Sequence, residues 1–260
     1  MAKTVTKSTN NKKTISHQRN EKIFQYAVAI IVALVLFFIF SIYLYYRRGF
    51  YDLYIMNKIF AGVAAVQLGM VLLFGPLSRM FQIYDNLLKF RNEFGIVAFI
   101  MAMLHVIFSL FFLGNHFPFA SYFTPLNVPF IFGLTAIIIL TILFLLSNDV
   151  SRKLLRPQFW WKIQYTGVRL AFIATALHVF IMKYPGWIDW YKKGGSSNLL
   201  HPEWPGLGLL VGWFLLLVII MRITEALNSH LGKVVAYIAP IILIAIYIFT
   251  FHWGFQMSRN

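Results

Sequence analysis

Long apolar stretches separated by short polar segments dominate the chain. Each stretch reaches roughly 20 residues, the length at which a helix crosses the ~30 Å hydrocarbon core of a bilayer. The strands of a membrane barrel would alternate apolar and polar residues, and these stretches are continuously apolar. The pattern therefore predicts an all-α fold, a polytopic transmembrane helical bundle of about seven spans. The predicted spans are 24–46, 55–76, 93–113, 127–147, 163–182, 206–222 and 233–254.

Composition supports a membrane protein. Of the 260 residues, 60% are hydrophobic and 12% are charged, whereas about 25% of a soluble domain is charged. We expect a disordered basic cytoplasmic tail over residues 1–22 and a transmembrane bundle over residues 23–260. Residues 183–205 are expected to form a loop. The first apolar stretch is longer than a signal-peptide core and lacks a small-residue cleavage site after it, so a retained span is predicted.

The distribution of Lys and Arg predicts the orientation. Most of them fall in the tail and in the loops on the same side of a seven-span arrangement. The positive-inside rule then places the N-terminus in the cytoplasm and the C-terminus outside. Topology explains the net charge of +15, so membrane lipids are the expected partners and nucleic acid is not. The absence of soluble modules favours a prokaryotic plasma membrane.

Two histidines lie inside predicted spans that run in the same direction. His105 follows Arg91 by 14 residues, and His178 follows Lys162 by 16 residues. At 1.5 Å per residue, both imidazoles lie about 21–24 Å above the inner charge boundary. Two imidazoles at one depth on two helices can hold a metal between them. Ionisable groups at this depth are rare and usually functional.

Small residues share a helix face with each histidine. A flat macrocycle between two helices needs such small neighbours, and bundle cores house cofactors of this kind. The alternative is that small residues simply allow close helix packing and that each histidine is a structural hydrogen-bonding residue. The positions are Gly95, Ala98 and Ala102, with Ser109 beyond, on the His105 span, and Gly167, Ala171 and Ala174 on the His178 span.

The available ligand side chains favour a haem over other metal centres. The chain contains no cysteine, which excludes iron–sulfur clusters, covalently attached c-type haem and dithiol relays. Structural zinc needs four ligands and catalytic zinc usually three. Two histidines suffice for a haem because the porphyrin supplies the four equatorial nitrogens. Two strong axial ligands leave no open iron position, which suits electron transfer.

Five short motifs follow one another between about residues 62 and 182. They are Gly75-Pro-Leu-Ser-Arg79, Arg91-Asn-Glu-Phe-Gly95, Ala102-Met-Leu-His105, Trp161-Lys162 and Ala176-Leu-His178-Val-Phe180. In this order and spacing they resemble the ferric-reductase-like transmembrane domain family, which includes the six-transmembrane metalloreductases and the haem subunit of the bacterial methionine sulfoxide reductase system. The resemblance implies haem b, with His105 and His178 as axial ligands of the outer-side haem.

One departure from the family pattern concerns the inner haem. Many members carry a further histidine about 13–14 residues before each of the two ligands. Here Gln164 and Tyr165 stand at one of these places, and Arg91 and Asn92 at the other. A single haem is therefore expected, with a flavin or a quinone on the cytoplasmic side near Arg91, Gln164, Tyr165 and Arg169. The alternative for Arg169 is that it snorkels to the cytoplasmic interface.

The sequence thus predicts transmembrane electron transfer through a single b-type haem. The donor would be a cytoplasmic flavin partner or a membrane quinol, and the acceptor would lie outside the cytoplasm. No Gly-rich dinucleotide loop is present, so electrons from NAD(P)H would need a partner protein. The membrane subunit of an oxidoreductase fits this description. The alternative is a non-redox transporter or an assembly or scaffold subunit, although an ion-coupled transporter would need acidic residues deep in its spans.

Four other polar residues have a predicted position or contact. Gln67 is predicted to make an interhelical hydrogen bond, with a quinone contact as the alternative. His116, His201 and His252 are expected near the outer surface, where they could form a metal or propionate site only if they cluster in space.

Overall fold

In the computed structural model, the chain folds as an all-α membrane protein with seven helical segments long and apolar enough to span a bilayer. The structure describes residues 2–124 and 127–258, with side chains described from residue 19 onward except that of Asp149, and it contains no strand within them. The elements are α1 (Ala2–Arg48), α2 (Leu53–Met80), η1 (Gln82–Phe90), α3 (Arg91–Ile107), η2 (Phe108–Phe112), α4 (Phe119–Tyr122), α5 (Val128–Leu146), α6 (Asp149–Leu154), α7 (Pro157–Lys193), α8 (Leu207–Leu227) and α9 (Ser229–Met257).

Local sequence explains where the spans begin and end. Asp52 caps α2, because its Oδ1 accepts a hydrogen bond from the Ile55 amide at 2.7 Å. Asn127 and Asn228 cap α5 and α9 in the same way. Gly49 ends α1 and Gly194 ends α7. Both have positive φ, which glycine adopts without steric cost.

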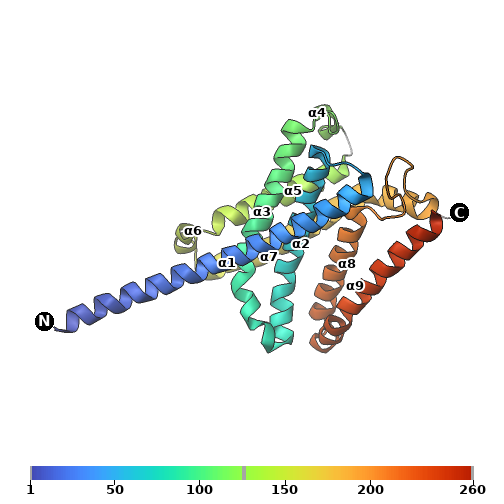
Figure 1. Cartoon of the computed structure of the whole chain (residues 1–260). Coiled ribbons are helices and arrows are strands. Elements are labelled where there is room, and N and C mark those ends of the chain that lie inside the picture. Colours follow the sequence, from blue (N-terminus) through green and yellow to red (C-terminus); the bar gives the residue numbers. More distant parts are fainter. Residues whose placement is uncertain (1, 125–126, 259–260) are drawn as a thin grey trace.

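Helix α2 is the centre of the bundle. In its most apolar stretch 67% of the residues are buried, whereas the other six spans reach at most 39%. Helices α1, α3, α7 and α8 pack against it, and Figure 1 shows α8 and α9 as a hairpin beside it. A span surrounded by other helices must be apolar on all faces, which explains why α2 is rich in Ala, Val and Leu.

Four helices form a ring within this bundle. Helix α2 packs against both α3 and α7, and α5 packs against the same two helices. Neither diagonal pair, α3 with α7 or α2 with α5, packs closely along its length. Residues carried by α3 and α7 can therefore face each other across the middle of the ring.

The loop predicted over residues 183–205 is partly wrong. Helix α7 continues through Pro185 to Lys193, so the connection to α8 covers only residues 194–206. The residues after His178 retain helical spacing on one face, at Phe180, Tyr184, Trp187 and Tyr191. Packing of that face against α8 offsets the hydrogen bond that Pro185 removes.

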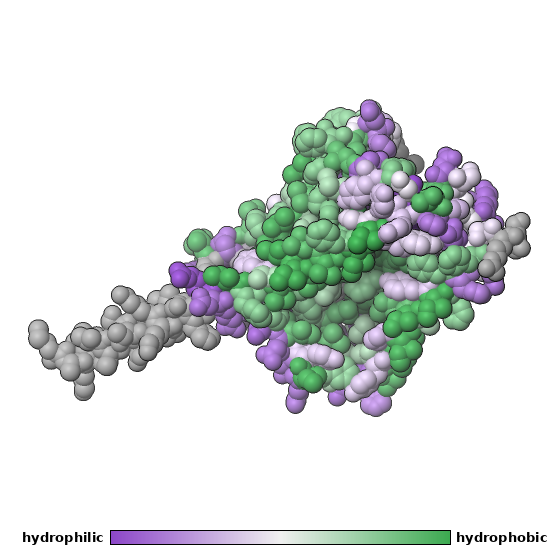
Figure 2. All heavy atoms as spheres, viewed as in Figure 1, coloured by the Kyte–Doolittle hydropathy of each residue, from purple (hydrophilic) through white to green (hydrophobic). Residues whose placement is uncertain are grey.

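The surface suits a bilayer. Hydrophobic side chains, green in Figure 2, cover the middle of the molecule, and hydrophilic ones, purple, gather at its margins. We call the end where α2 finishes and α3 begins the inner end, because charge predicts that it faces the cytoplasm, and the opposite end the outer end. This orientation stays a prediction. The separate tail over residues 1–22 also stays a prediction, and α1 begins at Ala2.

Candidate functional site

The His105 imidazole is held by α2. Its Nδ1 lies 3.0 Å from Oδ1 and 3.2 Å from the backbone oxygen of Asn57. A backbone carbonyl oxygen can only accept, so Nδ1 carries the proton and donates. Asn57 is buried, and its Nδ2 donates to Ser109 Oγ at 2.9 Å, which turns Oδ1 toward the imidazole. Ser109 lies in η2, a π-helical turn of the kind that often occurs at functional sites.

The His178 imidazole is held by α5. Its Nδ1 donates to the backbone oxygen of Pro129 at 2.7 Å. One turn further along α5, Gly133 lies against the same ring. A Cβ placed on Gly133 would lie 2.9 Å from His178 Nδ1 and 3.2 Å from Cε1. Glycine is therefore required at this position if the imidazole is to keep its place.

The two hydrogen bonds give both histidines the same protonation pattern. With Nδ1 protonated, the neutral imidazole presents an unprotonated Nε2. Within the described residues, both imidazoles make their hydrogen bonds through Nδ1 and none through Nε2. A metal-ligating histidine typically has this arrangement, in which the second nitrogen donates to a carbonyl and fixes the ring.

The two imidazoles are carried by opposite helices of the ring. His105 comes from α3 and His178 from α7, the diagonal pair that does not pack closely together. They are nonetheless near enough for charges on them to interact. Among the described residues no group of three or more His, Asp or Glu could hold a metal ion. The donor set is thus two imidazoles, which fits a haem better than a bare zinc ion.

Cations lie close to the imidazole pair at the outer end. Lys183 on α7 is near enough to interact electrostatically with both His105 and His178. Lys58 on α2 interacts in turn with Lys183 and Arg48, and its Nζ lies 3.7 Å from the centre of the Tyr54 ring. A b-type haem carries two propionate carboxylates, and these cations match that charge.

The small residues predicted to face a cofactor have different surroundings. A Cβ on Gly95 would meet nothing within 4 Å, so there is open space beside this glycine. Ala98, Ala171 and Ala174 are buried, and Ala102 is partly buried against the core. A Cβ on Gly167 would lie 2.7 Å from the Leu143 side chain of α5. Gly167 thus lies on the α5 side, which favours the packing alternative for this residue.

The sequence comparison adds a family to this geometry. Residues 60–175 match the model of a family described as "Ferric reductase like transmembrane component". The family predicted from the motifs is confirmed for this segment. No curated protein matches the chain.

The matched segment covers α3 and α5 completely, most of α2, and α7 as far as its middle, so it spans most of the four-helix ring. It includes His105 and ends three residues before His178, short of the limit near residue 182 expected from the motifs. A transmembrane component of this kind suggests electron transfer across the membrane. Helices α1, α8 and α9 lie outside the matched segment.

At the inner end, three of the four residues predicted to form a second site come together. Arg169 lies over the Tyr165 ring, with its Cζ 3.2 Å from the ring centre, and its Nη1 donates to the Tyr165 backbone oxygen. Arg91 on α3 is near enough to interact electrostatically with both of them. Gln164 is different: its Nε2 donates to the Leu143 backbone oxygen at 3.2 Å, so it is directed at α5.

Two further arginines extend this cluster. Arg222 on α8 and Arg79 on α2 are near Arg91 and Arg169, and both pair with Glu225. Within the described residues Arg91 and Arg169 have no carboxylate partner. One carboxylate thus pairs with two of the four arginines, which leaves excess positive charge. We call these five residues, together with Tyr165, the arginine cluster.

The remaining expectations have clear outcomes. Gln67 makes the predicted interhelical hydrogen bond, from its Nε2 to the Ala29 backbone oxygen of α1 at 2.9 Å. The three outer histidines have separate partners. His116 stacks on Tyr54, His201 bonds Glu203, and His252 bonds Gln256.

Sequence reasoning missed the residues that support the histidines. Asn57, Pro129 and Gly133 are each 45 or more residues away from the histidine they contact. The local signals were an Asn beside a Lys inside an apolar span and a Pro-x-x-x-Gly spacing on α5. Neither signal identifies its partner without the fold.

Proposed function

We propose that this protein transfers electrons across the membrane through one b-type haem, with His105 and His178 as the axial ligands. The observation that carries the proposal is the shared hydrogen-bonding pattern of the two imidazoles. Each donates from Nδ1 to a carbonyl oxygen and keeps Nε2 free, on two helices that face each other across the four-helix ring.

The haem would supply a one-electron couple at its iron, and the chain would fix the conditions for it. Asn57 and Pro129 orient the imidazoles and increase the electron density on their Nε2 atoms. Lys183 and Lys58 balance the propionate charge. Two strong axial ligands favour electron transfer over binding of oxygen.

We further propose that electrons enter at the inner end and leave at the outer end. The donor would be a cytoplasmic flavin protein or a membrane quinol, and the arginine cluster supports an anionic or carbonyl-bearing donor group there. The acceptor would be extracytoplasmic. The charge distribution supports this direction in a prokaryotic plasma membrane, with the N-terminus inside.

An absorption spectrum of the detergent-purified protein tests the proposal. We expect a b-type haem spectrum that changes on dithionite reduction, with about one haem per chain by the pyridine haemochrome method, because two axial histidines hold a single iron. His105→Ala and His178→Ala should each abolish it. His116→Ala is the matched control, since this outer histidine stacks on Tyr54 and should leave the haem in place. A colourless wild-type protein made with ample haem supply would contradict the proposal.

A further inference from the structure

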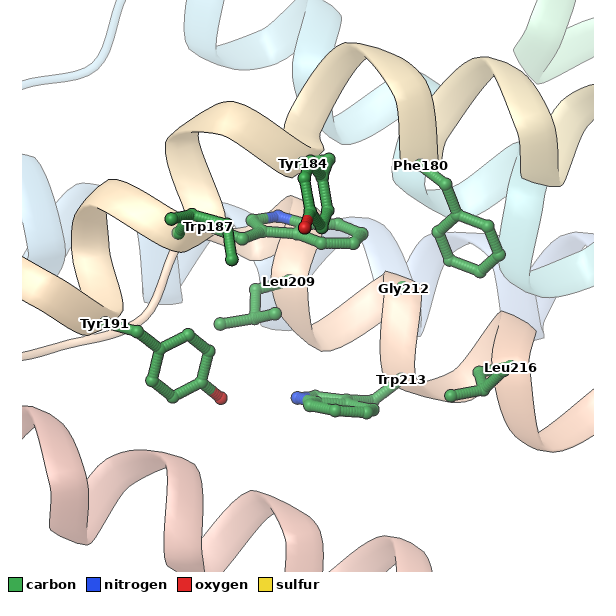
Figure 3. A pocket seen from close by; sticks show the side chains of 9 residues that line it. Phe180, Tyr184, Trp187, Tyr191, Leu209, Gly212, Trp213 and Leu216 are labelled. Atoms are coloured by element: carbon green, nitrogen blue, oxygen red, sulfur yellow. The ribbon is translucent and has the colours of Figure 1, made fainter.

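A second feature of the outer end lies outside the ferric reductase like domain. The last turns of α7 and the first turns of α8 line a partly open cavity of about 150 Å³ (Figure 3). Its wall is almost wholly apolar and is rich in aromatic rings. The residues that define it include Tyr184, Trp187 and Tyr191 from α7, and Leu209, Gly212 and Trp213 from α8.

Two residues that line this cavity carry a hydrogen-bond donor without a partner in the described part of the chain. Trp213 Nε1 is buried and makes no hydrogen bond. The Tyr191 hydroxyl, on a half-buried residue, makes none either. In Figure 3 the ring nitrogen of Trp213 and the hydroxyl of Tyr191 point toward one another. A buried donor is almost always satisfied in folded proteins, so the unpaired Trp213 Nε1 favours an acceptor atom supplied by a ligand, to which the Tyr191 hydroxyl can also donate.

The size of the cavity and its aromatic walls suit a single ring. A Cβ on Gly212 would lie 2.6 Å from Trp187 Cη2, so the absence of a side chain there lets the indole lie directly on α8. An apolar protein cavity of about 150 Å³ is large enough to bind benzene. The space therefore matches one six-membered ring between aromatic walls.

We infer that this cavity binds the head ring of a membrane quinone. One ring carbonyl oxygen accepts hydrogen bonds from Trp213 Nε1 and from the Tyr191 hydroxyl, and the aromatic walls hold the ring. Tyr184, 60% exposed, and Leu216, 36% exposed, lie at the border of the cavity. They leave a route from the lipid, where quinones dissolve. The site is at the opposite end of the bundle from the arginine cluster, and binding there does not require a haem.

Equilibrium dialysis of the full-length protein in detergent tests the inference. The probe is a benzoquinone with a ten-carbon tail, and a chamber with detergent micelles alone corrects for partitioning. Trp213→Phe and Tyr191→Phe each remove one donor and keep the ring, so each should weaken binding about 3- to 10-fold. Leu216→Trp fills the cavity from its border and should weaken binding at least about tenfold. Tyr45→Phe, at an exposed tyrosine on α1, is the matched control and should bind as wild type.

Three results would overturn the inference. One is unchanged affinity in both Trp213→Phe and Tyr191→Phe, provided that the variants elute as the wild type does in size exclusion. Another is unchanged affinity in Leu216→Trp. The third is displacement of the quinone by an equal concentration of a fatty-acid methyl ester, because the site would then accept lipid ester carbonyls. His178→Ala should retain quinone binding, so failure of the haem proposal and failure of this one are distinguishable.

Discussion

The histidine pair and the arginine cluster lie toward opposite ends of the helical bundle and are built differently. Around the histidines, each Nδ1 has a carbonyl partner and only Nε2 is left free. In the arginine cluster, two of the four guanidinium groups share one carboxylate, and the other two have no carboxylate partner within the described residues. The first arrangement fixes the orientation of each imidazole, and the second concentrates positive charge. We therefore expect the first to act through the direction of its nitrogens and the second through its charge.

Removing the acceptor beside His105 should break the geometric site most severely. Asn57→Leu deprives His105 Nδ1 of its side-chain acceptor and frees Ser109 from its hydrogen bond. Loss of such supporting groups lowers metal affinity by about 10- to 100-fold. Titration of the apoprotein with haemin measures the change. Wild-type haem affinity in Asn57→Leu would show that the hydrogen bond does not support ligation.

Crowding the His178 ring should have a somewhat smaller effect. Gly133→Ala places a Cβ 2.9 Å from His178 Nδ1 and forces the imidazole to move. Overpacking of this kind costs about 1–3 kcal/mol, so haem retention during gel filtration and the thermal midpoint should both fall. Gly75→Ala is the matched control, because a Cβ there meets nothing within 4 Å. Equal behaviour of the two alanine variants would count against the arrangement.

Removing a cation near the imidazoles should lower haem binding by less than either of these two substitutions. Lys183→Met keeps an unbranched side chain against Gly208 and removes the charge that interacts with both histidines. A partly screened ion pair contributes about 0.2–1 kcal/mol, so haemin affinity should fall about two- to fivefold. Lys193→Met, at an exposed lysine near the end of α7, should leave it unchanged. A larger loss in the control than in Lys183→Met would exclude the propionate role.

A substitution in the arginine cluster should slow reduction of the protein and leave its haem content unchanged. Arg169→Gln removes a charge that lacks a carboxylate partner, so haem content should stay at the wild-type level. Reduction of the protein by reduced flavin mononucleotide should slow by up to about fivefold, the range of a partly exposed ion pair. Stopped-flow absorbance measures the reduction rates of Arg169→Gln and of the wild-type protein at low and at high salt. Because salt screens charge, the difference between the two proteins should be smaller at high salt. Loss of haem in Arg169→Gln would contradict the division between the two sites.

The sequence predicts the spans and the histidine pair because these depend on local pattern. Apolar length defines seven spans, and helical rise sets His105 and His178 at one depth. The predicted end of α7 was wrong because the polar composition of residues 183–205 suggested a loop, whereas packing against α8 continues the helix to Lys193. Composition is a local property, and the packing that overrides it is not.

Partners distant in sequence could not be predicted for the same reason. Periodicity places Gly167 on the face of Ala171 and Ala174, but only the fold shows Leu143 against it. Arg222 joins Arg91 and Arg169 through the position of α8, which carries no motif linking it to α3 or α7. The hydrogen bond from His178 to Pro129 spans 49 residues and depends on how α5 packs against α7.

The electron paramagnetic resonance spectrum of the oxidised wild-type protein tests the central claim most directly. Two imidazoles on one iron give a six-coordinate ferric haem with strong axial ligands. We predict a low-spin ferric signal from one haem per chain, replaced by a high-spin signal or by no signal in His178→Ala. A high-spin ferric signal in the wild-type protein would mean that one axial position is open, and it would contradict the pairing of His105 with His178.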